Sequence, residues 1–305
     1  MDMFNSLLST RGLSLDRLTN FCRIAEAGGI AKAAEGDPGK QSLYSRQIRE
    51  LEEFFGVELK RRHGKGMAIT EAGWRLVRLT RAHLLGLADF QSEARSQPKR
   101  LSIVAGNSIL EWVLLPKIGL LRNALPNTTL EFSSERTGFL VRKLIDMTID
   151  VGLIRENALQ APLKARRLFE LGYSVFVPDK LAAGVTKKDL KARLADIPLA
   201  TSIGGHFREV LEQAAAKAKW PMEIQVACSS FTQAARTVKA GTCAAVLPDI
   251  AAQDFDLSNV MQFKLPFMSA ERRKICVVWN PRLAGVRPII TAAVDAIRAS
   301  VGQEI

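Results

Sequence analysis

The segment from residue 41 to residue 73 constrains the fold of this chain more than any other. Its first part, QSLYSRQIRELEEFFG, has apolar residues at i, i+4, i+7 and i+11, which is a helical spacing. That apolar stripe consists of Tyr44, Ile48, Leu51 and Phe55. A neighbouring arc of roughly 140°, at the helical 100° per residue, holds the polar residues Gln41, Ser42, Ser45, Arg46 and Arg49. The pattern predicts a helix with one core face and one cationic face.

The polar face has the chemistry that reading a DNA major groove requires. Gln can pair with both edge atoms of adenine, Arg can pair with those of guanine, and Ser can bond several base edges or a phosphate. In helix-turn-helix proteins the first turns of the second helix meet the bases. The alternative interpretation is the solvated face of an ordinary amphipathic helix.

A short basic hairpin is expected after this helix. Val57–Leu59 is the predicted first strand, Lys60–His63 a cationic cluster, Gly64–Gly66 the turn and Met67–Ile69 the second strand. Lys and Arg on such a wing can reach phosphates beside the groove. Thr70 then caps a new helix, so the segment predicts a winged helix-turn-helix.

Two shorter helices are expected before this segment. Ser14 is a candidate cap for the first helix, Gly28 and Gly29 end it, and Ile30–Glu35 forms the second. The first helix has a helical stripe of apolar residues at Leu18, Phe21, Cys22 and Ala25. Both helices therefore serve as scaffold for the cationic helix.

The run from Leu15 to Gly73 resembles the DNA-binding domain of the LysR-type transcriptional regulators. The matching pieces are FCRIAEAGGIAKAAE, SRQIRELEEFFGVELKRR and GKGMAITEAG. The resemblance implies that helix and wing residues face DNA. The predicted DNA-binding residues are Gln41, Ser42, Tyr44, Ser45, Arg46, Arg49, Arg62 and Lys65.

The turn before the cationic helix departs from the family pattern. Lys40 stands where the family usually has Ser or Thr, and Ser42 stands where it has Pro or a similar small residue. Gly36-Asp37-Pro38-Gly39 replaces a stretch that normally contains apolar residues. The sequence therefore predicts a remodelled turn.

A long helix is expected from Thr70 to about Arg95. It carries apolar residues at Leu76, Leu79, Leu84, Leu87 and Phe90. Its 25 or so residues would span about 37 Å. It could simply cover its own domain; the resemblance implies instead a linker helix that pairs with a second copy, so that dimers read half-sites about one helical turn apart. Residues 91–100, with Pro98, form the expected domain boundary.

Beyond residue 100 the pattern changes to alternating strands and helices, which predicts a parallel sheet. Expected strands are Leu101–Ala105, Thr129–Ser133, Ile149–Leu153, Tyr173–Val177, Leu199–Thr201, Ile224–Ala227, Ala244–Leu247 and Ile275–Trp279. Expected helices are Ile109–Ala124, Phe139–Asp146, Lys187–Ala195, Phe207–Lys217, Phe231–Ala240 and Pro288–Val301.

This second half resembles the effector-binding domain of the same family, through LLPKIGLLRNALPNTTLEF, IDVGLIRE and VKAGTCAAVLP. The resemblance implies a periplasmic-binding-protein-like, Rossmann-like α/β fold of two lobes around a cleft, with crossings near Gly172 and Lys274. The predicted domains are a winged helix-turn-helix over 1–70, a linker helix over 71–98 and an effector-binding domain over 99–305. Lobe I covers about 99–172 and 274–305, and lobe II about 173–273.

Ligands in such sheets lie at the carboxyl ends of strands, beside helix N-termini. The effector-binding residues predicted by position are Asn107, Ser108, Ile109, Arg136, Thr137, Arg155, Thr201, Ser202, Ser230 and Phe231. Hydroxyls, an amide and guanidiniums would suit a small anionic effector. The alternatives are helix capping for the Ser and Asn positions and a surface ion pair for Arg136 or Arg155.

Composition limits the other classes of protein. A chain of 305 residues suggests two domains. The net charge of +12 is compatible with nucleic acid. Residues 1–100 contain 17 basic and 12 acidic residues, and residues 101–305 contain 26 basic and 19 acidic residues. Because both parts carry excess positive charge, the charge distribution does not locate a DNA site. No targeting segment or run of about 20 apolar residues is visible. A cytoplasmic protein without a membrane segment is expected.

Two alternatives that use the cleft remain, an enzyme and a solute-binding protein. The sequence lacks G-x-G-x-x-G, P-loop, G-x-S-x-G and H-E-x-x-H motifs, and its three histidines are widely separated. We therefore expect no catalytic residue, no metal site and no cofactor apart from the effector. A solute-binding protein would need export and would leave residues 41–73 without a purpose.

The four cysteines have no C-x-x-C spacing. They are Cys22, Cys228, Cys243 and Cys276. Buried reduced thiols are expected; the alternative, suggested by the resemblance, is an oxidant-sensing pair of Cys228 and Cys243. The expected partners are double-stranded promoter or operator DNA, a small-molecule effector, further copies in a homodimer or homotetramer, and RNA polymerase.

Overall fold

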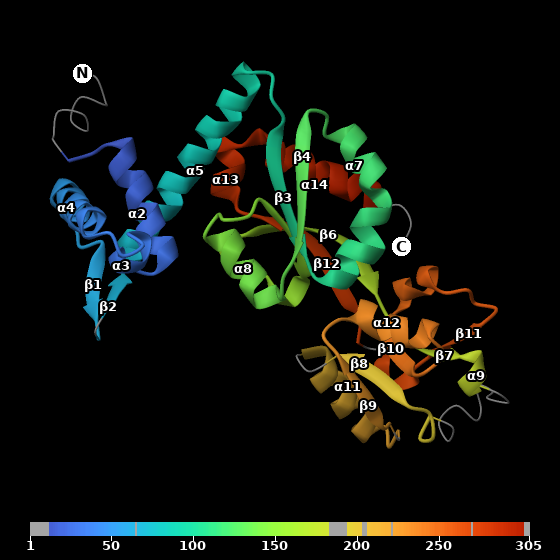
Figure 1. Ribbon diagram of the computed structural model, residues 1–305. Coiled ribbons are helices and arrows are strands. Elements are labelled where there is room, and N and C mark those ends of the chain that lie inside the picture. Colours follow the sequence, from blue (N-terminus) through green and yellow to red (C-terminus); the bar gives the residue numbers. More distant parts are fainter. Residues whose placement is uncertain are drawn as a thin grey trace. The chain divides into compact units, whose positions relative to one another are not determined.

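The computed structural model describes residues 12–64, 66–182, 194–202, 206–220, 222–269 and 271–301. Lys65 and most of the helix expected over 187–195 lie outside these residues. The chain divides into two compact units, residues 1–96 and 97–305 (Figure 1). The first unit contains α2 (Leu15–Ala27), α3 (Ile30–Ala33), α4 (Pro38–Phe55), β1 (Lys60–His63), β2 (Gly66–Ile69) and α5 (Glu71–Ala94).

Side-chain caps set where the helices of the first unit begin. Ser14 Oγ accepts the Arg17 amide at 3.2 Å at the start of α2, and Thr70 Oγ1 accepts the Gly73 amide at 3.0 Å at the start of α5. Both caps were predicted. A third cap was not: Asp37 Oδ1 accepts the amides of residues 39 and 40 at 2.8 and 3.1 Å. Pro38 and Gly39, expected in the turn, therefore form the first turn of α4.

The wing, which is the β1–β2 hairpin, starts later than expected. β1 pairs antiparallel with β2, and Lys60 faces Ile69. Val57–Leu59, the predicted first strand, precedes this ladder. Glu52 Oε1 accepts the amides of Leu59 and Lys60 at 2.9 and 3.2 Å, so a side chain from α4 replaces a strand partner there. The cationic cluster consequently lies along β1 rather than at the hairpin tip.

The core of the first unit joins α2, α4 and α5. Its buried residues are Phe21, Cys22, Ile24, Ala25, Ala34, Tyr44, Ile48, Leu51, Leu59 and Val77. The stripe predicted on α4 is correct for its first three members. Phe55 is 38% exposed, contrary to expectation, because the core ends at Leu51 and the last turn of α4 extends beyond it. There Phe55 makes an edge contact with Phe54, with ring centroids 4.9 Å apart.

The second unit contains two five-stranded sheets. Lobe I has the order β4-β3-β5-β12-β6 and lobe II the order β11-β7-β10-β8-β9. The lobe I strands are β3 (Lys99–Ala105), β4 (Thr128–Ser134), β5 (Val151–Arg155), β6 (Lys164–Leu171) and β12 (Arg273–Trp279). The lobe II strands are β7 (Tyr173–Pro178), β8 (Leu199–Ser202), β9 (Ile224–Cys228), β10 (Ala244–Pro248) and β11 (Val260–Lys264).

Both sheets are mixed, whereas a parallel sheet was expected. β3 is parallel to β4 and β5, and β8 is parallel to β9 and β10, as the βαβ pattern predicts. β12 is antiparallel to β5, and β7 to β10. Each of these two strands enters its lobe from the other lobe, at the edge where the parallel strands end. It must therefore run in the opposite direction.

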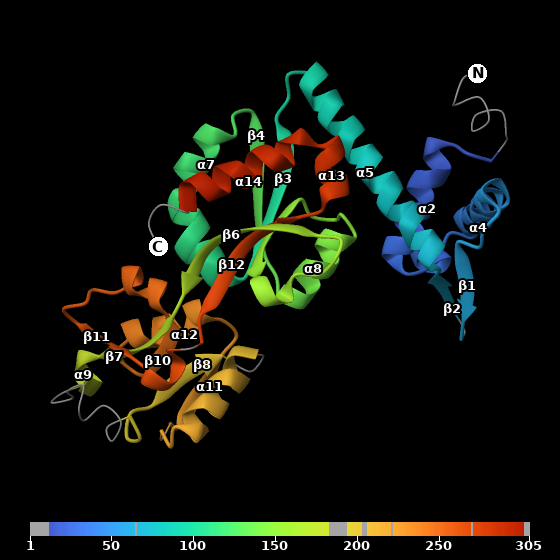
Figure 2. The same ribbon diagram turned by 180° about the vertical axis from the view of Figure 1, so that it is seen from behind.

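The helices of the second unit pack on these sheets. They are α6 (Asn107–Ile109), α7 (Ile118–Ala124), α8 (Thr137–Ile145), α9 (Asp179–Ala182), α11 (His206–Lys217), α12 (Phe231–Lys239), α13 (Pro281–Val286) and α14 (Pro288–Val301). The helix predicted over 109–124 is interrupted by a π-helical turn at Leu110–Leu114 and a 3-10 turn at Leu115–Lys117. Pro116 has no amide to donate, which prevents a continuous α-helix. α14 begins and ends as predicted and lies beside α7 (Figure 2).

Within the described residues, the chain crosses between the two lobes twice. Gly172 separates β6 from β7, and β12 begins at Arg273. Gly172 approaches the second lobe closely, because a Cβ there would lie 2.6 Å from Asp249 Oδ2. No helix among the described residues is long and apolar enough to cross a bilayer.

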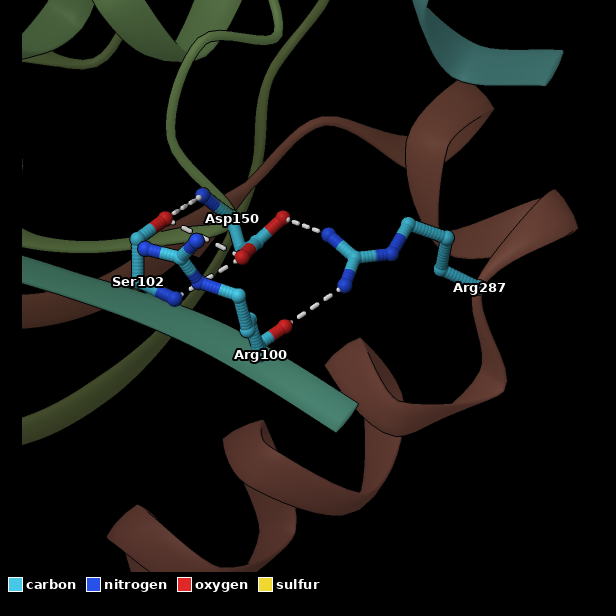
Figure 3. A network of polar contacts seen from close by, with 4 residues as sticks. All are labelled: Arg100, Ser102, Asp150 and Arg287. Atoms are coloured by element: carbon cyan, nitrogen blue, oxygen red, sulfur yellow. Dashed lines mark hydrogen bonds and ion pairs between the residues drawn. The ribbon is translucent and has the colours of Figure 1, made fainter. Parts of the chain in front are cut away.

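A buried polar network holds the start of lobe I together (Figure 3). Asp150 Oδ2 accepts the amide and the hydroxyl of Ser102 at 2.8 and 3.0 Å. Arg287 pairs with Asp150 Oδ1 through Nη1 and donates from Nη2 to the Arg100 carbonyl at 2.7 Å. The network joins β3, the residue before β5 and the α13–α14 connection.

Candidate functional site

The first candidate site is the polar face of α4. Ser42, Arg46 and Arg49 are exposed, and Gln41 and Ser45 are half-buried, so the predicted set lies on one accessible face. The Arg46 side chain is 69% exposed, with its Nε 3.8 Å from Glu50 Oε1. Contact this weak leaves the guanidinium available to a ligand.

Two residues of α4 differ from expectation. Tyr44 is 7% exposed and packs in the core of the first unit. Its place on the apolar stripe already indicated this burial. Exposed Lys40 was not in the predicted set, and the Asp37 cap includes it in the first turn of α4.

The wing supplies a second group of cations in the same unit. Arg61 and Arg62 are exposed on β1, where register pairs them with Ala68 and Met67. Arg61 was not in the predicted set, because the resemblance matched only Arg62 and Lys65 to the wing. Lys65, the predicted wing contact, lies outside the described residues. Alternate strand positions point to opposite faces, so Arg61 and Arg62 present charge on both faces of the wing.

The second candidate site is the interlobe pocket, a cavity of about 570 Å³ in the second unit. It is lined by Arg155, Glu156, Asn157, Glu170, Tyr173, Phe207, Val210, Ser269, Glu271, Arg272, Arg273 and Lys274. These residues come from the end of β5, from both crossings between the lobes and from α11. Cavities of this size commonly hold small molecules.

Two guanidiniums are close to one another in this pocket. Burial lowers the pKa of Arg155, and the charge of Arg273 lowers it further. The Arg273 guanidinium lies over two rings, 5.3 Å from the Phe231 centroid and 5.7 Å from that of Tyr173. Arg273 Nε is buried without a hydrogen-bond partner among the described residues. The stacking holds Arg273 in place but leaves this donor unsatisfied.

The aromatic rings form one cluster on the lobe II side. Tyr173 and Phe207 have centroids 4.6 Å apart, and Phe231 meets Phe207 edge-on at 4.7 Å. Burial raises the pKa of Tyr173, and Arg273 and Arg155 oppose that rise. The phenol is therefore neutral at ordinary pH.

Of the ten predicted effector-binding residues, only Arg155 lines the interlobe pocket. Phe231 does not line the pocket but contacts the ring of Phe207, which does. The rest are Asn107, Ser108, Ile109, Arg136, Thr137, Thr201, Ser202 and Ser230, which sit at strand ends and helix starts as predicted but do not line the cavity. Ser230 caps α12 at 3.2 Å, the alternative considered for it. The buried hydroxyls of Thr201 and Ser202 have no partner among the described residues, and we have no physical account of them.

Sequence reasoning missed Tyr173, Phe207 and Arg273. Tyr173 and Arg273 lie beside the expected lobe crossings, and Phe207 lies at the start of an expected helix. The usable signal was the cationic run Arg272-Arg273-Lys274 beside the expected return to lobe I.

The lobes are also joined directly, away from the crossings. Trp112 Nε1 donates to Asp254 Oδ2 at 2.9 Å, and Gln253 Nε2 donates to the Trp112 carbonyl at 2.6 Å. Thr232 Oγ1 donates to Glu111 Oε1 at 3.3 Å. A π-helical turn of lobe I is thereby bonded to two elements of lobe II.

The cysteines are all free and buried. Burial raises the pKa of Cys22 to about 11 and also raises that of Cys228. A raised pKa lowers the reactive thiolate fraction of these two thiols. The described residues contain no cluster of three or more metal-ligating side chains.

A winged helix-turn-helix unit joined to a two-lobed α/β unit with a small-molecule pocket defines the class of one-component, ligand-responsive DNA-binding proteins. The family models agree. Residues 15–74 match the bacterial regulatory helix-turn-helix protein of the lysR family, and residues 94–301 match the LysR substrate binding domain. The chain belongs to the LysR family and is a DNA-binding transcriptional regulator with an effector-binding domain.

Individual relatives are distant. The chain is 23% identical to the uncharacterized HTH-type transcriptional regulator YybE of Bacillus subtilis, over 87% of this chain and 91% of YybE. Among solved structures, ArgP from Mycobacterium tuberculosis has a TM-score of 0.66 at 18% identity, over 95% and 98% of the two chains. A full-length OxyR variant from Pseudomonas aeruginosa has a TM-score of 0.65 at 20% identity, over 95% and 99%. These structures support the fold.

Proposed function

We propose that this regulator senses a small molecule in the interlobe pocket and transmits its binding to DNA through lobe closure. The observation that carries the proposal is the position of the pocket. Its lining includes residues beside both lobe crossings, Tyr173 on one and Arg273 on the other. A ligand there contacts both lobes, so its binding free energy depends on their separation. The coupling can be no larger than the ligand's difference in affinity for the two states.

The DNA contacts proposed are those of the α4 face and the wing. Gln41, Ser42, Ser45, Arg46 and Arg49 would meet base edges and phosphates in the major groove. Arg62, Arg61 beside it and Lys65 would meet the flanking phosphates.

The working form proposed is a homodimer or homotetramer in the cytoplasm, with no catalytic role and no cofactor other than the effector. RNA polymerase would be a further partner at the promoter. In a dimer, lobe closure would change the relative placement of the two winged domains on their half-sites.

DNA binding of the purified chain is the first test. A footprint on the DNA just upstream of its own coding sequence, at two salt concentrations, should show protection of an interrupted inverted repeat. Phosphate contacts should make the affinity fall steeply with salt. Absence of binding both there and on random duplex, at either salt concentration, would overturn the assignment of α4 and the wing to DNA.

Arg46→Ala tests whether α4 reads sequence. If Arg46 makes a bidentate base contact, discrimination between operator and random duplex should fall by about 1–3 kcal/mol. Competition binding measures this difference directly. Arg23→Ala, an exposed arginine on α2, is the control and should change discrimination little. Equal effects of the two substitutions would remove Arg46 from the base-reading set.

A further inference from the structure

The interlobe pocket has an excess of unpaired positive charge. Of its lining carboxylates, Glu156 lies 3.8 Å from Lys274 Nζ, and Glu170 pairs with Arg167 at 2.9 Å. Among the described residues, no ion pair joins Arg155, Arg272 or Arg273 to a carboxylate, and Glu271 is the one lining carboxylate left unpaired. The described lining of the pocket therefore has three guanidiniums without a carboxylate partner and one unpaired carboxylate.

Arg155 and Arg273 form the half-buried part of this excess. Arg273 is held against the rings of Tyr173 and Phe231, so it cannot swing out to solvent without losing both contacts. Arg155 is half-buried at the end of β5. Burial lowers the pKa of Arg155, and the charge of Arg273 lowers it further, so the two charges disfavour one another. An anion between them would remove that repulsion and satisfy their free donors.

The wall beside these guanidiniums is aromatic. Tyr173 and Phe207 line the pocket, and each is 8% exposed. Phe231 supports Phe207 from behind, which fixes the orientation of the wall. Val210 is the only aliphatic hydrophobic residue among the described lining residues. A planar ring can stack against such a wall and gains more from it than a saturated ring of similar area.

We propose that the interlobe pocket binds an aromatic carboxylate, with its carboxylate on Arg155 and Arg273 and its ring against Tyr173 and Phe207. Arg155 is the ligand's principal anchor because its guanidinium is not engaged in stacking. The cavity of about 570 Å³ has room for an acid of one or two rings. This assignment rests on the proposed function, since it names the ligand class of the same pocket.

Calorimetric titration of the full-length chain tests the assignment with matched probes. The carboxylates are benzoate, phenylacetate and 2-naphthoate. Each is compared with its carboxamide, which lacks the charge, and benzoate is also compared with cyclohexanecarboxylate, which lacks the aromatic ring. At least one aromatic carboxylate should bind. Its carboxamide should bind at least tenfold more weakly. Cyclohexanecarboxylate should bind about three- to tenfold more weakly than benzoate.

Variants locate the binding site. Arg155→Gln keeps a polar side chain of similar length and should weaken carboxylate binding at least tenfold. Phe207→Leu keeps an apolar wall and should reduce the preference for the aromatic acid over the saturated one. Arg122→Gln, an exposed arginine on α7, is the control and should leave both quantities unchanged.

Any of three results would overturn the inference. They are no binding of any aromatic carboxylate at millimolar concentration, equal binding of acid and carboxamide, and undiminished binding to Arg155→Gln. The DNA footprint distinguishes failure of the ligand assignment from failure of the proposed function. Salt-dependent operator binding without carboxylate binding would refute the ligand class alone, whereas loss of operator binding would refute the DNA assignment.

Discussion

Asp150 and Arg287 show how single residues depend on their polar neighbours. Both are almost fully buried, at 5% and 3% exposure. Three further groups around them, the amide and hydroxyl of Ser102 and the Arg100 carbonyl, satisfy the charged atoms (Figure 3). Because a buried charge is costly unless paired, the ion pair should matter mainly when one partner is removed.

Arg287→Met should therefore destabilise the effector domain by about 3–5 kcal/mol, since it removes the Arg287 cation that pairs with the buried Asp150 carboxylate. Urea unfolding followed on the effector-domain transition measures this loss. Arg166→Met is the control: it removes an exposed pair, Arg166–Asp295 at 2.6 Å in the same lobe, and should cost about 1 kcal/mol or less. Equal losses for the two variants would contradict the role given to the buried network.

At the residue scale, caps and strand ends were predictable, but the lining of the pocket was not. Ser14 and Thr70 were recognised because a cap is a local hydrogen bond to an amide three residues on. Arg155 was found because it follows a buried strand. Tyr173 and Phe207 could not be joined to it from sequence, since their contact requires two lobes to meet.

At the element scale, the crossing of α5 over the wing depends on one glycine. A Cβ on Gly73 would lie 2.3 Å from the Leu59 carbonyl oxygen and 2.6 Å from Ile69 Cγ2. Backbone lies on one side of the contact, so a neighbouring side chain cannot simply rotate away. The helix can approach the hairpin only where no side chain intervenes.

Gly73→Ala should displace the wing from α5, destabilise the winged unit by about 1–3 kcal/mol and weaken DNA binding. Thermal unfolding and operator titration measure the two effects. Gly119→Ala is the control, because nothing lies within 4 Å of a Cβ in that helix of the second unit. It should stabilise the chain by about 0.5–1 kcal/mol. A Gly73→Ala protein as stable as the parent would show that the wing tolerates the displacement.

The elements missed from sequence have weak periodic signals. β6 is an edge strand whose first four positions, KARR, include three exposed charged residues. β11 has only two buried residues of five. Both strands form by pairing with a neighbouring strand: β6 pairs with β12, and β11 pairs with β7. Pairing of this kind is decided by tertiary context rather than by propensity.

At the scale of the whole molecule, α5 carries several exposed apolar side chains. Leu79, Leu87 and Phe90 are 56%, 53% and 70% exposed. At the helical 100° per residue they fall within an arc of about 80°. Such a face on a 24-residue helix suits pairing with a second copy, as proposed for the working form.

The double substitution Leu87→Glu and Phe90→Glu should therefore weaken self-association, because it buries charge at the proposed helix pair. Sedimentation velocity across a protein concentration series measures the shift toward monomer. Leu257→Glu, at a 58% exposed apolar position of the effector domain, is the control and should leave the distribution unchanged. If the double variant sediments like the parent, copies of the chain associate through another surface.

The sequence by itself determined the family and most of the elements of each unit. The periodicities of helices and strands, the caps and the family-like runs are local patterns. Local patterns can be recognised in a sequence without knowledge of tertiary contacts. They predicted the winged unit and the two-lobed unit, which the structure confirms.

Only the tertiary structure decided where β1 begins, which strands run antiparallel and which residues share the pocket. Glu52 from α4 delays the wing, and re-entry between lobes reverses β7 and β12. Arg155, Tyr173, Phe207 and Arg273 meet because the two crossings bring strand ends and α11 together. Each outcome depends on contacts between residues distant in sequence, and no local pattern contains that information.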